Sequence, residues 1–133
     1  MDEVIVKFYR RLLKDGFENA GSLENPSIFL DSIGENVALC GAIASSYMHL
    51  FVNVVNGRID DVRYLCICDP TANVAAEILC TLARGKTLEE AQAITEDSFF
   101  PILGKPCPDL SQRAKGLLEL LNRGICRYRG KGN

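Results

Sequence analysis

The spacing of apolar residues changes along the chain, from a helical period at the start to an alternation before the middle. Residues 3 to 15 carry apolar side chains three or four positions apart, which predicts an amphipathic helix that Asp15-Gly16 ends. After a turn-rich stretch, residues 27 to 34 favour a short strand.

A clearer alternation covers residues 47 to 55 and predicts a strand with one apolar face. The residues expected on that face are Met48, Leu50, Val52 and Val54. Asn56-Gly57 is a two-residue hairpin signal, because a type I′ turn needs a positive φ at both positions. Residues 58 to 67 therefore return as the partner strand, with Cys66 on its inward face.

The second half of the chain carries helical signals. Asp69 is a good N-cap before Pro70, which suits the first position of a helix that Gly85 is expected to stop. The capping-box pair in "TLEE" then opens a short helix over 88 to 95.

A turn or short helix over 96 to 103 leads to Cys107-Pro108, a second helix start. The last helix is expected over about 108 to 122, closed by Gly124, with a frayed tail from about residue 124. Helix, small antiparallel sheet and then helices predict a single α+β domain over 1-133. We expect about three strands with the helices packed on one face.

Composition is that of an ordinary globular protein, with 47% hydrophobic and 24% charged residues among 133. A formal net charge of −2 gives no reason to expect nucleic acid, although the last residues are basic. The start does not resemble a signal peptide and no segment approaches transmembrane length. We therefore expect no membrane association and a cytoplasmic location.

Six cysteines are many for a reducing compartment, where thiols are more often core residues, metal ligands or reactive groups than disulfides. The single histidine, His49, excludes a site that needs two imidazoles and is interpreted as a packed or partly exposed ring. There is no glycine-rich phosphate loop. Any chemistry is therefore expected at sulfur.

Position distinguishes some of these thiols. Cys68 and Cys107 lie at predicted helix starts, where the helix dipole and free N–H groups lower a thiol pKa, although each also fits a small apolar residue at the end of an element. Cys40 lies in a glycine-containing loop. Asp69 is explained by its N-cap role and is also chemically able to ligate a metal. The other thiols are interpreted as Cys66 in the core, Cys80 exposed or under a partner, and Cys126 free in the tail.

Several short strings add a resemblance. They are "NAGSL" at 19 to 23, "CG" at 40 to 41, "NGRIDDVRY" at 56 to 64, "GKTLEEA" at 85 to 91, and the cysteine at 107. In this order the chain resembles a divergent member of the NifU/IscU-type iron–sulfur cluster scaffold family. The most specific strings form a hairpin and a capped helix, so they support the fold more than the activity.

In that family three cysteines hold a nascent cluster. The resemblance places the first on Cys40 and the third on Cys107. Counting back from Gly85, the middle position falls on Asp69, one residue from Cys68. Cys68 is the favoured middle ligand, with Asp69 as a substitute or additional one.

The chain departs from the family at two other ligand candidates. The family's aspartate after Cys-Gly is Ala42 here, and its histidine before the third cysteine is Pro106. The proline-rich peptide that a chaperone reads in some members is reduced to "ILGKP". The ligand set and the lability of a bound cluster therefore need not follow the family's.

The resemblance implies a scaffold rather than an enzyme. A cysteine desulfurase would deliver persulfide sulfur, with Cys107 as the expected acceptor, and iron would join it. The cluster, with 2Fe-2S as the first expectation, would pass to acceptor proteins. The resemblance also allows a chaperone as a partner and a homodimer as the oligomeric state.

Two rival hypotheses keep the fold. In the first, zinc is bound by Cys40, Cys68, Cys107 and Asp69 in a sulfur acceptor or regulator of the desulfurase. In the second, Cys66 and Cys68 form a metal-free persulfide or thiol carrier.

Overall fold

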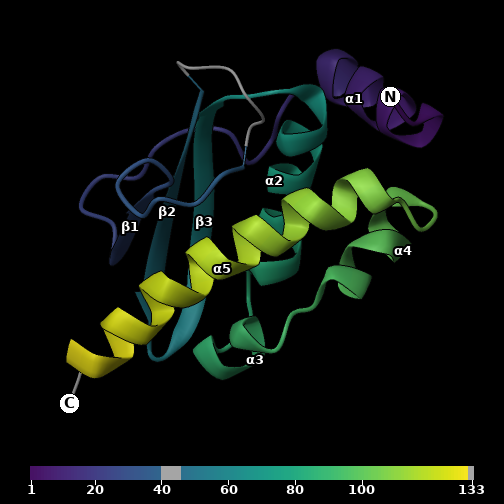
Figure 1. Cartoon of the computed structure of the whole chain (residues 1–133). Coiled ribbons are helices and arrows are strands. Elements are labelled where there is room, and N and C mark those ends of the chain that lie inside the picture. Colours follow the sequence, from purple (N-terminus) through teal and green to yellow (C-terminus); the bar gives the residue numbers. More distant parts are fainter. Residues whose placement is uncertain (40–45, 132–133) are drawn as a thin grey trace.

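The computed structural model describes residues 1–39 and 46–131. Its elements are α1 (Glu3–Asp15), β1 (Ile28–Asp31), β2 (Tyr47–Val55), β3 (Arg58–Ile67), α2 (Pro70–Ala83), α3 (Leu88–Gln92), the 3₁₀ helix η1 (Glu96–Phe99), α4 (Phe100–Leu103) and α5 (Pro108–Lys131). The strands form an antiparallel sheet in the order β1-β2-β3, and α2 and α5 lie against one face of it (Figure 1). The predicted α+β class with helices on one face is confirmed.

The β2–β3 hairpin follows the alternation in the sequence. The inward residues Met48, Leu50 and Val52 are fully buried. At the turn, Asn56 has a φ of 53° and Gly57 a φ of 73°, the left-handed values that a type I′ turn requires. β1 joins the free edge of β2, with Ile28 opposite Val52, so the expected short strand is also confirmed.

The capping box before α3 forms as expected, with Thr87 accepting from the Glu90 N–H and Glu90 accepting from the Thr87 N–H. α3 ends at Gln92 rather than at residue 95. The Ala93 N–H bonds to the Glu90 carbonyl at 3.1 Å, so the chain tightens into a turn there.

α2 is buried on nearly every side, because it packs against β3, α1, α5 and η1. Cys80 is fully buried, so the prediction that it is exposed or under a partner was wrong. A helical wheel identifies a polar side of α2, but it cannot show that α1 and the other elements cover that side. Burial, and then the Glu77 carboxylate, raise the pKa of the Cys80 thiol, which makes it a poor nucleophile.

α5 continues to Lys131, so the predictions that Gly124 ends it and that the tail from there is frayed were wrong. Gly124 lies inside the helix against β1. A Cβ atom there would come within 2.7 Å of both the Ile28 Cγ2 and Leu30 Cδ1 atoms. Glycine therefore serves close packing of α5 on the sheet rather than helix termination.

Arg123 and Arg127 of this last segment are also held in place by contacts with Glu35. The Arg123 Nη1 atom donates to the Glu35 carbonyl at 2.6 Å, and Arg127 pairs with the Glu35 carboxylate. The Arg127 guanidinium, helped by Arg123, holds the pKa of Glu35 below its usual range. Among the described residues, no helix combines the length and apolar character needed to cross a membrane.

Candidate functional site

Two helices begin with the same arrangement, a side chain that is able to bind a metal ion followed by a proline. Asp69-Pro70 begins α2 and Cys107-Pro108 begins α5. The Asp69 carbonyl accepts from the Asn73 N–H at 3.0 Å. The Cys107 carbonyl accepts from the Ser111 N–H at the same distance. Asp69 and Cys107 therefore hold equivalent positions, and Cys68 lies one residue before the equivalent position in α2.

Asp69 uses both of its carboxylate oxygens. Oδ1 accepts from the Ala72 N–H at 2.8 Å, which is the predicted N-cap bond. Oδ2 accepts from Arg113 Nη2 on α5 at 2.7 Å. Arg113 Nε is buried and has no hydrogen-bond partner among the described residues. The carboxylate thus joins the start of α2 to the side of α5.

The described residues on either side of Cys40 contact α5 and the end of β3, which precedes α2. Leu39 is buried and packs against Gly116 of α5, where a Cβ atom would clash with its side chain. Gly116 lies three positions beyond Arg113, on the same face of the helix. Tyr47, on the other side, pairs with Ile67 at the end of β3. Cys40 itself, with Ala42, lies outside the described residues.

Cys107 is a free thiol that is only 1% exposed. The pKa of the nearby Asp2 carboxylate is lowered, chiefly by its hydrogen bond from the Val4 N–H, and Lys105 and the Cys107 thiol lower it further. The Lys105 Nζ atom lies 3.5 Å from the Asp2 Oδ1 atom. A reagent or protein partner can therefore reach the Cys107 sulfur only if neighbouring groups move.

Cys66 and Cys68 are joined in a disulfide. Cys66 packs against the core, as expected, but the interpretation that separated its thiol from that of Cys68 was wrong. Cys68 lies one residue beyond the end of β3, and both cysteines are partly buried against the core. Their Cα atoms are 5.7 Å apart, less than the roughly 6.8 Å of two residues along an extended strand, so the chain contracts as it leaves β3.

The remaining candidates are structural or free. His49 packs between Tyr47 and Phe29, with ring centroids at 4.6 and 5.2 Å, as expected of a packed ring. Cys126 is a free thiol, as predicted. It is exposed and accepts a hydrogen bond from Gln92 Nε2 at 3.3 Å. Across residues 1–39 and 46–131, no three His, Cys, Asp or Glu side chains lie close enough together to hold a metal ion.

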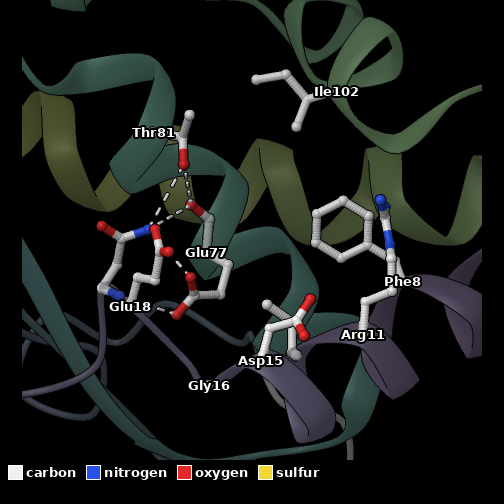
Figure 2. Close-up of a pocket in the computed structure, with 10 residues that line it drawn as sticks. Phe8, Arg11, Asp15, Gly16, Glu18, Glu77, Thr81 and Ile102 are labelled. Carbon is white, nitrogen blue, oxygen red and sulfur yellow. Dashed lines mark hydrogen bonds between the residues drawn. The ribbon is translucent and has the colours of Figure 1, made fainter.

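A polar cavity of about 370 Å³ lies between α1 and α2 (Figure 2). Glu77, 4% exposed, lies at this cavity and accepts from Asn19 Nδ2 at 3.0 Å and from the Tyr64 hydroxyl at 2.8 Å. Burial, together with the Glu77 charge, raises the pKa of Tyr64 and keeps its hydroxyl protonated. The Asn19 carbonyl also accepts from the Tyr64 N–H at 3.1 Å. These satisfied bonds attach the "NAGSL" segment to β3 and α2, which is a structural role.

The sequence did not reveal Arg113 or Glu77 as important residues. The Arg113–Asp69 pair joins positions 44 residues apart, and it depends on how α2 packs on α5. Asn19 could be found from the sequence, because it belongs to the family-like string "NAGSL". The string did not indicate that Asn19 binds Glu77.

Comparison with known proteins gives a consistent result. The family described as NifU-like N terminal domain matches residues 13–133. Two proteins of Archaeoglobus fulgidus, named iron-sulfur cluster assembly scaffold proteins IscU 1 and IscU 2, are each 26% identical over 111 residues, covering 83% of this chain and 67% of theirs.

Two solved structures share the fold. The N-terminal part of a nitrogen-fixing NifU-like protein from Brucella abortus has a TM-score of 0.63 at 15% identity, over 98% of this chain and 94% of its own. A putative iron-sulfur cluster assembly scaffold protein for the SUF system, from Fervidobacterium islandicum AW-1, has a TM-score of 0.60 at 16% identity, over 94% and 96%.

Proposed function

The chain belongs to the family of NifU-like N-terminal domains, and from this premise we propose that it is a scaffold on which an iron–sulfur cluster is assembled and then transferred to acceptor proteins. The names of the two archaeal relatives support this role. The structural observation that carries it is the pair of equivalent helix starts, one with a carboxylate and one with a thiol, with Arg113 of α5 bound to the carboxylate. The role is binding and transfer, with no turnover of a substrate.

The proposed donors for the cluster are Cys40, Cys107 and a middle ligand at Cys68 or Asp69. Thiolate and carboxylate oxygen are both suitable donors for iron. The structure, with Cys68 in a disulfide and both Asp69 oxygens engaged, fits such a cargo only after reduction of the disulfide or release of Arg113. The equivalence of Asp69 with Cys107 favours Asp69 for the middle position.

Sulfur is proposed to come from a cysteine desulfurase, as a persulfide on Cys107. Because this thiol is 1% exposed, docking of the desulfurase would have to open the contact around Asp2 and Lys105. The cluster type is proposed as 2Fe-2S. The zinc-binding alternative uses the same four donors, Cys40, Cys68, Cys107 and Asp69.

The Cys66–Cys68 disulfide favours the second alternative, a metal-free thiol or persulfide carrier. Anaerobic reconstitution of the fully reduced protein with iron and inorganic sulfide separates the three functions. A scaffold gives a coloured protein that holds iron and sulfide in equal amounts. A colourless protein with one zinc per chain contradicts the scaffold role, and a colourless, metal-free protein favours the carrier. Cys126→Ser, which changes an exposed thiol, is the matched control.

A further inference from the structure

We propose that Cys66 and Cys68 act as a dithiol that supplies the two electrons needed to release sulfide from a persulfide. This inference rests on the proposed scaffold role, because it names the source of the sulfide that a cluster requires. The observation that carries it is the disulfide between these two residues, next to the candidate middle ligand Asp69.

The electron balance explains why such a pair is useful. The outer sulfur of a persulfide is at the level of elemental sulfur, whereas cluster sulfur is sulfide, and the difference is two electrons for each sulfur atom. A dithiol that becomes a disulfide gives up two electrons. One passage of Cys66 and Cys68 from thiols to disulfide therefore matches the release of one sulfide.

The proposed reaction has two steps. In the first, the Cys68 thiolate attacks the outer sulfur of a donor persulfide, and the donor leaves as a thiol, so that Cys68 carries the outer sulfur. In the second, the Cys66 thiolate attacks the inner sulfur of the Cys68 persulfide. The Cys66–Cys68 bond forms, the bond to the outer sulfur breaks, and that sulfur leaves as hydrosulfide with the bonding electron pair. The proton lost from Cys66 passes to solvent.

The product of the second step is the disulfide that the structure holds. Another cycle requires its reduction by a dithiol reductant of the thioredoxin class. While the disulfide is present, Cys68 cannot act as a thiolate ligand. Sulfide release and ligation by Cys68 therefore exclude each other until reduction occurs.

Among the thiols that the structure describes, Cys66 is the one placed to resolve a persulfide on Cys68. Cys107 and Cys80 are buried, at 1% and 0% exposure, and Cys126 lies near the other end of α5. Cys66 and Cys68 are only partly buried, so a persulfide donor can approach them more easily than Cys107, and this route does not require a persulfide on Cys107. Their Cα separation of 5.7 Å lies within the range that a disulfide spans without moving the backbone.

The test uses the whole chain, reduced, freed of reductant and kept without oxygen, with glutathione persulfide as the probe. Released sulfide and protein mass are measured together. We expect nearly one sulfide per chain, and a protein lighter by two hydrogen atoms. Cys66→Ser should retain the outer sulfur as extra mass and release at least about tenfold less sulfide, because the resolving thiol is gone.

Cys66→Ala, with its fold verified by circular dichroism, repeats the test if the serine variant is unstable, and Cys126→Ser should behave as the unmodified protein. Equal sulfide release from Cys66→Ser and the unmodified protein would overturn the proposal. So would retention of a persulfide on Cys68 of the unmodified protein, located by mass spectrometry of its peptides.

A second measurement separates this inference from the scaffold role. Reconstitution with iron and inorganic sulfide bypasses the persulfide. Normal cluster formation without sulfide release from the persulfide contradicts the dithiol step alone. Sulfide release without cluster formation contradicts the scaffold role and leaves the dithiol step standing.

Discussion

The starts of α2 and α5 share a backbone geometry and differ in what their side chains do. The Asp69 side chain is 28% exposed, and it caps its helix and binds Arg113. Cys107 occupies the equivalent position with a buried thiol that is in no disulfide. The side chain at one helix start forms hydrogen bonds that stabilise the fold, whereas the side chain at the other is a buried free thiol. We therefore expect changes at Asp69 to alter stability more strongly than changes at Cys107, and changes at Cys107 to have the larger effect on iron binding.

The largest expected effect comes from Cys107→Ala. We expect the affinity for iron after reconstitution to fall at least about a hundredfold. Loss of a residue that only hydrogen-bonds to a metal ligand already lowers metal affinity by up to about a hundredfold, and loss of the ligand itself should cost more. The free energy of unfolding should fall by only about 1 kcal/mol, because one buried sulfur atom is removed. Iron content and urea denaturation measure the two effects. A variant that binds iron as well as the unmodified protein would show that Cys107 is structural.

Asp69→Ala should reverse that balance. Loss of the N-cap costs about 1 kcal/mol, and loss of the partly exposed pair with Arg113 adds about 1 kcal/mol. We therefore expect urea denaturation to show a fall of about 2 kcal/mol in the free energy of unfolding. Asp69→Asn, which keeps the capping oxygen and removes the charge, should lose about half as much. Equal losses in both variants would assign the whole effect to the ion pair.

Asp69→Cys makes the two helix starts alike. If this position holds the middle ligand, the added thiolate should slow the loss of iron to a chelator by about tenfold, because thiolates bind iron clusters more strongly than carboxylates. The variant should also lose about 1 kcal/mol of stability with the cap. If the variant loses iron to the chelator as fast as the unmodified protein, Cys68 becomes the better candidate for the middle ligand.

The smallest effect concerns access to Cys107. Asp2→Asn weakens the contacts with Lys105 and Cys107, so alkylation of the buried thiol should become faster by about threefold, as local opening becomes easier. The pKa of Asp2 is lowered from 3.8, chiefly by the Val4 N–H. Its stabilising contribution is therefore present above that pH and is lost as the pH falls through the lowered pKa. Urea denaturation should show the variant and the unmodified protein converging in acid, and a difference that persists there would contradict this assignment.

Local signals were sufficient for much of the fold. The Asn56-Gly57 turn, the Asp69 cap and the Thr87 capping box each depend on residues a few positions apart, and all three form as predicted. The alternation in β2 identified its buried face for the same reason.

The wrong predictions concerned packing between distant segments. Gly124 has the residue type of a helix end, but its role depends on the approach of α5 to β1. Cys80 lies on a polar side of its own helix that other elements cover. The Cys66–Cys68 bond was missed because Cys66 was assigned to the strand face and Cys68 to the following helix start, so the two thiols were not considered together.

The candidate site was predicted in part. Cys107 and Asp69 were identified as residues at helix starts, and the structure gives them equivalent positions. Arg113 was not identified, because only the packing of α2 on α5 brings it to Asp69. The role of each as a ligand stays a prediction.

The most direct test of the central claim is transfer of a cluster to another protein. The reduced chain is reconstituted without oxygen, freed of unbound iron and sulfide, and mixed with an apo-ferredoxin in the presence of an iron chelator. The scaffold account predicts that the ferredoxin gains its cluster signal as this chain loses its own, and that Cys107→Ala supports no transfer. Retention of the cluster by this chain, or complete loss of its iron to the chelator, would contradict the account.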